Sequence, residues 1–380
     1  MDHSRKAILV LEDGRTFHGA SFGADGEAFG EMVFNTSMSG YQEILTDPSY
    51  AGQIVCMTYP LIGNYGTNAE DVESRRPWVE GFVVREASRI ASNFRSTASL
   101  QDYLKDNNIV GLEHIDTRSL VRHIRDKGAM RAGISTIDTD KKSLLENVLS
   151  SPEMANRELS SGVTVDKKFE YESNAKIDGS AKFQISNLKS QINSYHIVAY
   201  DFGVKTNSLR EFARFGCRVT VVPTHTSATD TMALKPDGIF LSNGPGDPAA
   251  MSTVIAEIKK LAATQTPMFG ICLGHQLLGS ALGATTYKLK FGHRGGNQPI
   301  KDLTTGKIEI ASHNHGFAVA SESLPADVEV THINLNDQTV AGLRHKTLPV
   351  FSVQYHPESA PGPHDSEYLF ERFVALMSGR

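Results

Sequence analysis

The sequence predicts an α/β protein built from two domains. Short apolar runs alternate with amphipathic segments through the second half, which is typical of an open, mostly parallel sheet with helices on both faces. The first half has hairpin and helix signals without this alternation, and residues 166–194 are rich in Lys, Ser, Asn, Asp and Gln without a hydrophobic period. We therefore expect a mixed α/β domain at 1–153, a linker region at 154–194 and the open-sheet domain at 195–380.

The first half begins with two apolar runs, residues 7–11 and 16–22, that are separated by an Asp-Gly pair. This pair is a strong hairpin signal, so both runs are expected to be strands. A helix is expected after Asp116, since Asp is a good N-cap, and Gly128 provides its end. Arginines lie along this helix, and we interpret them as a solvated face rather than as an anion site.

In the second half, strands and helices are expected in close succession. The predicted strands are residues 196–200, 218–222, 238–241, 268–271 and 350–355. The predicted helices are residues 206–215, 251–263 and 276–282. Sheets of this kind bind their ligands beyond the carboxyl ends of the parallel strands, so a functional site is expected in the loops that follow those strands.

The composition is that of an ordinary globular protein. Hydrophobic residues make up 40% and charged residues 21% of the 380 residues. The formal net charge of −5 gives no electrostatic reason to expect nucleic acid or an anionic membrane as a partner. No window approaches the roughly 18 apolar residues of a membrane span, and no signal peptide is evident. We expect a cytoplasmic protein.

Three cysteines are widely spaced, which argues against a disulfide framework. Cys56 and Cys217 lie in apolar surroundings and are interpreted as small buried hydrophobes. Cys272 is instead the centre of Gly-Ile-Cys-Leu-Gly between a predicted strand and a predicted helix, the thiol version of a nucleophile elbow. The helix start stabilises a thiolate, and the N–H of Leu273 is free to donate to an oxyanion. A buried cysteine in a glycine-rich turn is the alternative.

A predicted strand that ends in His356-Pro-Glu358 supplies two further groups. Residues two apart in an extended chain face the same side, so Glu358 is expected to orient the His356 ring and to stabilise its imidazolium. Together with Cys272 they form a candidate nucleophile, base and orienting group at strand ends of one sheet. Gly244 and Gly246 follow another predicted strand and allow backbone groups to approach a ligand closely; a plain turn is the alternative.

His313 and His315 share one face of a predicted strand and raise the question of a metal site. A zinc site needs at least a third protein ligand, and the sequence makes none evident. We therefore predict no metal on this chain.

Several segments of the second half resemble class I (triad) glutamine amidotransferase domains. The resemblance covers Asn207 and residues 242–248, 270–276, 292–297 and 314–319. The first half is similar, in residues 30–50 and 58–66, to the signature of the small subunits of carbamoyl-phosphate synthetases. Other amidotransferases of the class lack this domain, so nearly the whole chain resembles that family.

The resemblance implies a glutamine-hydrolysing subunit with Cys272 as nucleophile, His356 as base and Glu358 as orienting group. It also implies residues that hold glutamine or its oxyanion: Ser49, Gly244, Gly246, Leu273, Gln276, Asn314, Gly316 and Phe317. A large-subunit partner is expected to receive the ammonia and to bind ATP, Mg²⁺ and bicarbonate, with no cofactor on this chain. The sequence contains no Walker-type phosphate loop, which is consistent with ATP binding elsewhere.

Three other functions stay open from the sequence. They are a glutaminase for another synthetase, such as one that makes GMP or anthranilate, a γ-glutamyl hydrolase that acts alone, and a non-catalytic regulatory subunit. The signature in the first half argues against the first, and the intact catalytic set argues against the last. The sequence does not decide the size of the assembly, a higher oligomer of heterodimers included, or whether the product serves arginine or pyrimidine synthesis.

Overall fold

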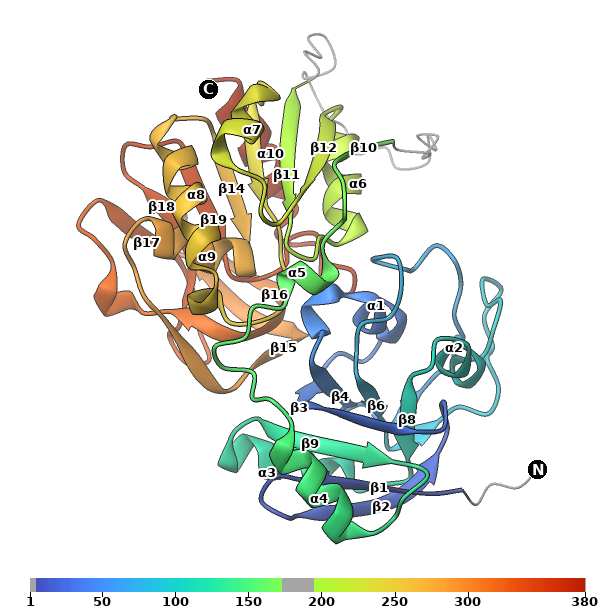
Figure 1. Ribbon diagram of the computed structural model, residues 1–380. Coiled ribbons are helices and arrows are strands. Elements are labelled where there is room, and N and C mark those ends of the chain that lie inside the picture. Colours follow the sequence, from blue (N-terminus) through green and yellow to red (C-terminus); the bar gives the residue numbers. More distant parts are fainter. Residues whose placement is uncertain (1–4, 173–194, 380) are drawn as a thin grey trace.

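The computed structural model describes residues 5–172 and 195–379, which form a lower and an upper domain in Figure 1. The lower, first domain contains a closed barrel with the strand order β1-β2-β8-β6-β4-β3-β9. Its strands are β1 (Lys6–Leu11), β2 (Thr16–Ser21), β3 (Glu27–Asn35), β4 (Gln53–Met57), β6 (Gly81–Val83), β8 (Val110–Glu113) and β9 (Met130–Ser135). β5 (Leu61–Ile62) and β7 (Glu86–Ala87) pair in a separate small sheet.

The predicted hairpin is present, since β1 and β2 pair antiparallel on either side of a turn that contains Gly14. Inward side chains such as Leu9, Ile54 and Ile134 fill the barrel with one apolar cluster. Cys56 is buried in the same cluster, and burial raises the pKa of its thiol to about 12, as expected of a structural cysteine. The first domain therefore has a hydrophobic core of its own.

The helices of the first domain are α1 (Tyr41–Thr46), α2 (Leu100–Asp106), α3 (Thr117–Lys127) and α4 (Lys141–Ser150), with the 3-10 turn η1 (Pro48–Tyr50). α3 begins as predicted, because the Asp116 side chain accepts a hydrogen bond of 2.9 Å from the N–H of Ser119. It ends at Gly128, whose φ of 110° favours glycine. Leu120 and Ile124 anchor α3 in the barrel core.

The second domain is organised around a ten-stranded sheet in the order β10-β12-β11-β13-β14-β19-β18-β17-β15-β16. Its strands are β10 (Phe169–Tyr171), β11 (His196–Asp201), β12 (Arg218–Pro223), β13 (Gly238–Leu241), β14 (Met268–Ile271), β15 (Thr286–Asp302), β16 (Ile308–Val319), β17 (Val328–Asn334), β18 (Val340–His345) and β19 (Val350–Val353). β12, β11, β13, β14 and β19 pair in parallel, and the other neighbours pair antiparallel.

The prediction of a mostly parallel sheet is therefore wrong for the half that β15 to β18 form. β15 and β16 are long and irregular, with register shifts between Lys288 and His293 and between Gly295 and Gln298. Such bulges break the alternation of buried and exposed residues by which a strand is recognised in a sequence. The parallel strands β11 to β14, which are short and almost wholly apolar, are present where the sequence predicts them.

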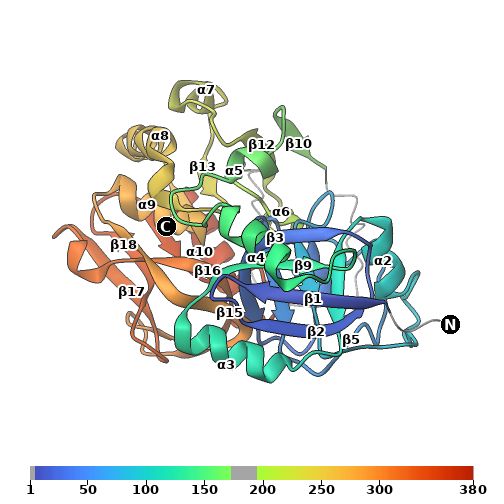
Figure 2. The ribbon, with the colours of Figure 1, turned by 60° about the horizontal axis from the view of Figure 1, so that its bottom comes forward.

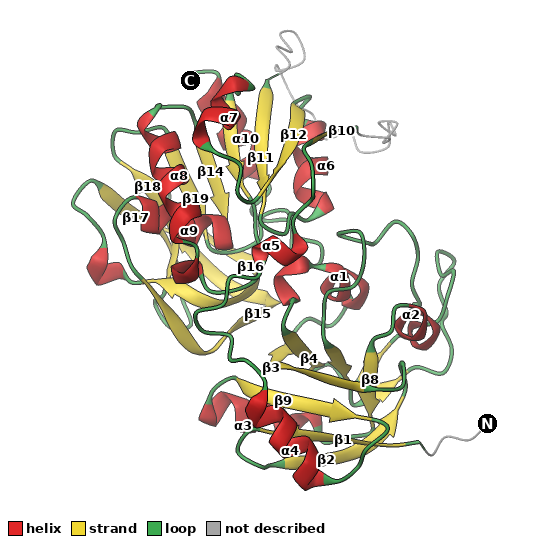
Figure 3. Cartoon of the chain, in the orientation of Figure 1, coloured by secondary structure: helices red, strands yellow, loops and turns green. Residues whose placement is uncertain are grey.

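Helices lie on both faces of this sheet (Figure 3). They are α6 (Thr206–Arg214), α7 (Ala228–Ala233), α8 (Ser252–Ala263), α9 (Leu273–Ala281) and α10 (Tyr368–Met377). α6 and α10 place Phe212 and Phe373 in a buried cluster on one face. α8 and α9 place Ile258 and Leu277 in a second cluster on the other face. α9 begins at Leu273, earlier than the predicted residue 276.

The segment predicted as a linker is structured in part. It contains α5 (Ser160–Val163) and β10, and β10 pairs antiparallel with β12 at the edge of the second sheet. Residues 173–194 of the segment lie outside the described residues. The second sheet thus begins inside the predicted linker. Throughout the described ranges, every helix is too short or too polar to span a membrane.

The two domains are in direct contact, with α3 of the first lying beside β15 of the second (Figure 2). The N–H of Ala129, just after α3, donates to the carbonyl of Lys290 in β15 at 2.7 Å. At another point of contact, Glu73 of the first domain accepts a hydrogen bond of 2.9 Å from the N–H of Asn207 in α6. Residues of both domains can therefore contribute to one site.

Candidate active site

Cys272 stands on the turn between β14 and α9. Its φ of 54° is uncommon for a residue with a side chain, and its N–H donates to the carbonyl of Val353 at 2.9 Å. A Cβ on the neighbouring Gly274 would collide with the carbonyl of Leu241, so the turn needs glycine there. Cys272 is 2% exposed, and its Sγ lies 3.5 Å from the carbonyl oxygen of Asn314.

His356 and Glu358 lie just beyond the end of β19, next to Cys272 in the sheet. The Nδ1–H of His356 donates to Glu358 Oε1 at 2.6 Å, so the two side chains share a face as predicted. The other ring nitrogen, Nε2, is buried without a hydrogen bond among the described residues and is the atom left for the thiol. Burial alone would lower the pKa of His356, but Glu358 and Cys272 outweigh burial and raise it to about 10. His356 is therefore an imidazolium at neutral pH.

Lys205 also belongs to this site, although no sequence motif singled it out. It lies between β11 and α6 with 2% exposure, and its Nζ donates to Glu358 Oε1 at 2.9 Å. Burial raises the pKa of Glu358, but Lys205 and His356 overcome this and lower it to about 2. Burial likewise opposes the charge on Lys205, and Glu358, Asp47 and Glu73 raise its pKa above the ordinary value. Its only signal in the sequence is a lysine in the short loop that follows a buried strand.

The loop after β13 approaches the thiol from the neighbouring strand. Gly246 has a φ of 97°, and a Cβ there would lie 2.6 Å from the carbonyl oxygen of Arg157, so only glycine fits without a shift of the backbone. A Cβ on Gly244 would collide with the carbonyl of Phe202. Both glycines line a pocket together with Cys272. This position favours a loop that contacts a ligand over a plain turn.

This pocket brings together most of the residues that the resemblance implies for glutamine. Its lining includes Ser49, Gly244, Gly246, Cys272, Gln276, Asn314, Gly316 and Phe317. Leu273 does not line it with the others, but its N–H, at the first position of α9, has no partner within the helix. The pocket has a volume of about 20 Å³, enough for one water molecule, so a substrate of glutamine's size requires the lining to open.

Ser49 reaches the pocket from the first domain, on η1. The side-chain amide of Asn243 donates to Ser49 Oγ at 3.0 Å, which leaves the hydroxyl hydrogen of Ser49 for another acceptor. Asp47 accepts from the N–H of Ser49 at 2.9 Å and from the side-chain amide of Asn314 at 3.0 Å. These side chains are buried, so hydrogen bonds join the two domains at the pocket itself.

Three further polar residues line the pocket and received no role from the sequence: Glu31, Gln53 and Arg294. Arg294 is 4% exposed, and its Nε donates to Gln53 Oε1 at 3.2 Å. Glu31 forms an ion pair with Lys288. A buried guanidinium and a carboxylate give the pocket both signs of charge, which suits the carboxylate and ammonium groups of an amino acid. Glu31 and Arg294 lie in segments that the resemblance covers, but neither received a role there.

His293, His313 and His315 form a buried cluster whose ring nitrogens lie within 4.8 Å of one another. The expectation that no third histidine is available is wrong, because β15 brings His293 beside β16. The cluster is bonded internally: His313 Nδ1 lies 2.9 Å from His315 Nε2, and His315 Nδ1–H donates to the carbonyl of Phe317 at 2.8 Å. Burial lowers the pKa of His313 and of His315 well below the ordinary range, so both are neutral. That the chain holds no metal stays a prediction.

Comparisons with known proteins match both domains. Residues 198–376 match the family described as glutamine amidotransferase class-I, and residues 9–134 match carbamoyl-phosphate synthase small chain, CPSase domain. The chain is 57% identical to the carbamoyl phosphate synthase small chain of Syntrophotalea carbinolica, with 98% of each chain covered. It is 54% identical to that of Chlorobaculum tepidum, with 98% of this chain and 97% of the other covered.

Among solved structures, the chain is similar to a glutamine amidotransferase from Thermotoga maritima, with a TM-score of 0.38 and 14% identity. The similarity covers 49% of this chain and 97% of the other. A putative GMP synthase component from Thermoplasma acidophilum is similar with a TM-score of 0.44 and 20% identity, over 50% of this chain and 96% of the other.

Proposed function

This chain belongs to the family of carbamoyl phosphate synthase small chains, and we propose that it hydrolyses L-glutamine at Cys272 and passes the ammonia to a large subunit that makes carbamoyl phosphate. The observation that carries the proposal is the buried series of side chains Cys272, His356, Glu358 and Lys205 beside a pocket with charges of both signs. A thiol, a charged imidazole and its carboxylate are the groups that thioester chemistry on a carboxamide needs.

In the first half of the reaction, the Cys272 thiolate attacks the carboxamide carbon of glutamine. The backbone N–H groups of Leu273 and Gly244 donate to the oxyanion that forms. His356, which is protonated at neutral pH, gives its proton to the departing nitrogen. The carbon–nitrogen bond breaks, ammonia leaves, and a γ-glutamyl thioester stays on Cys272.

In the second half, His356 is neutral and acts as a base. It takes a proton from a water molecule, which attacks the thioester carbon, and the bond to sulfur breaks. Glutamate leaves, and the Cys272 thiolate and His356 imidazolium are restored. Glu358 and Lys205 do not touch the substrate; they hold the His356 ring and stabilise its charged form.

The residues that hold glutamine come from both domains. In this proposal Ser49, Gly246, Gln276, Asn314, Gly316 and Phe317 hold the substrate. The side-chain amide of Gln276 donates to the carbonyl of Phe317 at 2.8 Å, which fixes one wall of the pocket. The first domain, residues 1–153, completes the site, and residues 195–380 form the amidotransferase domain, to whose sheet β10 from the connecting segment adds an edge strand.

The partner is a large subunit that binds ATP, Mg²⁺ and bicarbonate, and no cofactor is assigned to this chain. Ammonia is useful to that partner only if it reaches the second site before it is protonated or lost to solvent. A heterodimer with an enclosed path between the sites meets this requirement. The match of residues 9–134 to the CPSase domain supports this partner over a GMP or anthranilate synthetase.

The test is Cys272→Ser in the complex with the large subunit. The variant is expected to fold and to bind its partner, but to lose glutamine-dependent carbamoyl phosphate synthesis, because a serine hydroxyl stays protonated where a thiol ionises. Synthesis from added ammonia is expected to continue, since the partner's own site is intact. Glutamine use by the variant would show that the nucleophile is another residue.

A further inference from the structure

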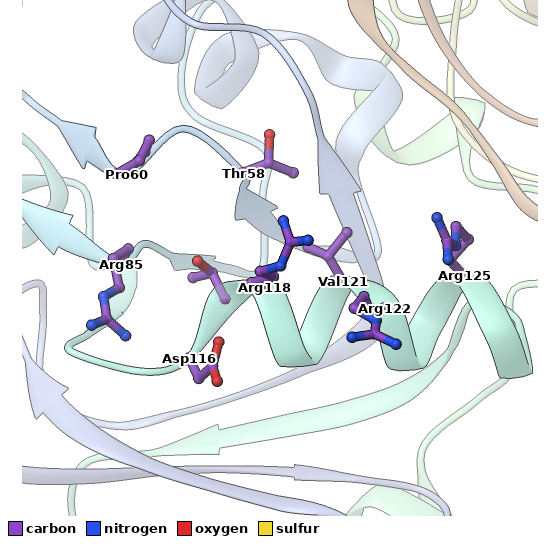
Figure 4. Close-up of a pocket in the computed structure, with 9 residues that line it drawn as sticks. Thr58, Pro60, Arg85, Asp116, Arg118, Val121, Arg122 and Arg125 are labelled. Atoms are coloured by element: carbon purple, nitrogen blue, oxygen red, sulfur yellow. The ribbon is translucent and has the colours of Figure 1, made fainter.

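A large hollow on the described surface lies on the first domain, away from Cys272, and we call it the α3 groove. It has a volume of about 820 Å³ and is lined by Thr58, Pro60, Arg85, Asp116, Thr117, Arg118, Val121, Arg122 and Arg125. Figure 4 shows Arg118, Arg122 and Arg125 following one another along α3, with Arg85 near its N-terminal end. No residue of this groove takes part in the chemistry proposed for the pocket at Cys272.

The arginines of α3 form a continuous positive stripe. Arg118, Arg122 and Arg125 are four and three residues apart, which places them on neighbouring turns of one side of the helix. At a rise of about 1.5 Å per residue, the stripe extends for roughly 10 Å. All three side chains are exposed. Arg85 lies near the N-terminal end of α3 and extends the stripe there; its Nη1 donates to the carbonyl of Ile115 at 3.2 Å.

The charge of this stripe is compensated less than that of Arg95 or Arg131 in the same domain. Among the described residues, Arg118 and Arg122 form neither a hydrogen bond nor an ion pair. Arg125 contacts the adjacent Asp126 at 3.6 Å. Arg95, in contrast, pairs with two carboxylates at 2.6 and 3.0 Å. A chain whose net charge is −5 thus keeps a local excess of positive charge on one helix.

Apolar side chains lie beside the stripe. Val121 and Pro60 line the groove, and Tyr59 and Leu61, on either side of Pro60, are each 39% exposed. Arginine and tyrosine beside exposed apolar groups is the composition of a protein interface. A small anion would instead need donors that converge on one point, whereas these charges are spread along the helix.

We propose that the α3 groove docks an acidic segment of the large-subunit partner. The inference rests on the proposed function for the existence of that partner, and it adds which surface binds it and by what chemistry. Carboxylates spaced along the segment pair with Arg118, Arg122 and Arg125, while its apolar residues pack on Val121 and Tyr59. The solvated face that the sequence indicated is therefore a recognition surface.

The place of α3 in the fold supports this assignment. α3 is anchored in the barrel core by Leu120 and Ile124, so the stripe is held on a rigid element. Its end lies against β15 through the hydrogen bond from Ala129 to Lys290. A partner bound here therefore contacts the first domain beside its junction with the amidotransferase domain.

The test is the double variant Arg118→Glu/Arg122→Glu, measured against the large subunit from the same organism. We expect its dissociation constant to rise by at least about tenfold at low salt, because like charges then face one another across the interface. The unmodified complex should weaken as NaCl is raised from about 50 to about 300 mM, and the variant should respond less. Lys235→Glu/Lys259→Glu makes the same change of charge on the far, amidotransferase domain and should leave binding unchanged.

The outcomes separate this inference from the proposed function. If the unmodified chain binds the large subunit, supplying it with ammonia, and the arginine variant binds equally well, the docking site is wrong while the function stands. If the unmodified chain neither binds the large subunit nor hydrolyses glutamine, the function itself fails. Saturable binding of inorganic phosphate in the groove, with partner affinity unaffected by the variant, would identify a small-anion site and also overturn the inference. Thermal unfolding of each variant verifies that it is folded.

Discussion

At the scale of single residues, Glu358 is the group on which the charge of the site depends. One carboxylate oxygen accepts from both His356 Nδ1 and Lys205 Nζ, at 2.6 and 2.9 Å. All three side chains are at most 2% exposed, so the interactions are only weakly screened by solvent. Removing one member of such a buried set leaves an uncompensated buried charge, which lowers the stability of the folded chain.

His356 and Glu358 are expected to differ in what their loss costs. His356→Asn removes the proton donor and base, which contributes about 10²–10⁴-fold in rate. Glu358→Ala should reduce kcat less, because the ring keeps its place in the chain and only its orientation and charge are affected. Comparison of kcat for the two variants decides the assignment; equal and negligible losses would mean that another residue is the base.

The same pair predicts a pH profile. The pKa of His356 is raised to about 10, so the imidazolium that we propose as the proton donor is present at neutral pH and is lost only as the pH rises through that value. In Glu358→Gln the carboxylate that raises this pKa is absent, and burial then lowers it. We expect the alkaline limb of kcat/KM for glutamine to move to lower pH in the variant. An unchanged limb would contradict the role given to Glu358.

The Lys205→Met variant is expected to be less stable than the unmodified chain and to turn over glutamine more slowly. The variant removes one of the two cations that hold the buried Glu358 carboxylate, and breaking such a buried set costs about 3–5 kcal/mol of unfolding free energy at pH 7. The folded-state pKa of Glu358 is lowered to about 2, so this stability is present above the ordinary value of 4.5 and is lost as the pH falls toward 2. The difference in unfolding free energy between the variant and the unmodified chain should therefore become smaller at acid pH. Urea unfolding at several pH values measures it, with the exposed Lys235→Met as control.

At the scale of elements, sequence patterns located the strands that carry the proposed catalytic residues. β13, β14 and β19 are short and nearly all buried, and each is followed by glycine or by His-Pro-Glu, so strand and site signals coincide. The closed barrel and the antiparallel half of the second sheet were not predictable in this way. Barrel closure is set by pairing between β1 and β9, far apart in the chain, and no local pattern encodes it.

The residues of the candidate site also divide into those that the sequence could predict and those that it could not. Cys272, His356 and Glu358 were predictable because each lies in a short motif with its own chemistry. Lys205 was not, since it is one charged residue whose partner, Glu358, lies on another element. The resemblance covers Arg294, but its contact with Gln53 on another element was not predictable. The role of such a residue can be inferred only when the fold shows which partner it contacts.

η1 is one of the first-domain elements that reach the pocket, and Ser49→Ala tests its role. The hydroxyl hydrogen of Ser49 is left for substrate because its oxygen already accepts from Asn243. Loss of one hydrogen bond costs about 0.5–1.5 kcal/mol, more to a charged group, so KM for glutamine should rise several-fold while kcat changes less. Steady-state kinetics give both constants. A fall in kcat at constant KM would instead place Ser49 at the reacting bond.

At the scale of the whole molecule, buried charges cross the boundary between the domains. Glu73 is 1% exposed in the first domain and accepts from Arg210 Nη1 at 3.3 Å in the second. Burial raises the pKa of Glu73 to about 7, even though Lys205 and Asn207 act against the rise. Glu73 and Asp47 in turn help to keep Lys205 charged. The first domain thus supports the proposed catalytic side chains as well as the pocket.

A truncated chain of residues 195–380 tests whether the amidotransferase domain can act alone. It keeps Cys272, His356 and Glu358 but loses Ser49 from the pocket, and Lys205 loses two of the carboxylates that support its charge. We expect it to fold, because its sheet has core clusters on both faces, but with KM for glutamine raised at least about tenfold from several lost hydrogen bonds.

The truncated chain should also fail to retain the large subunit in a pull-down, since α3 is absent. The full-length Arg118→Glu/Arg122→Glu variant is the matched control, because it should lose partner binding and keep its KM for glutamine. Tight binding of the large subunit by the truncated chain would refute the assignment of docking to the first domain.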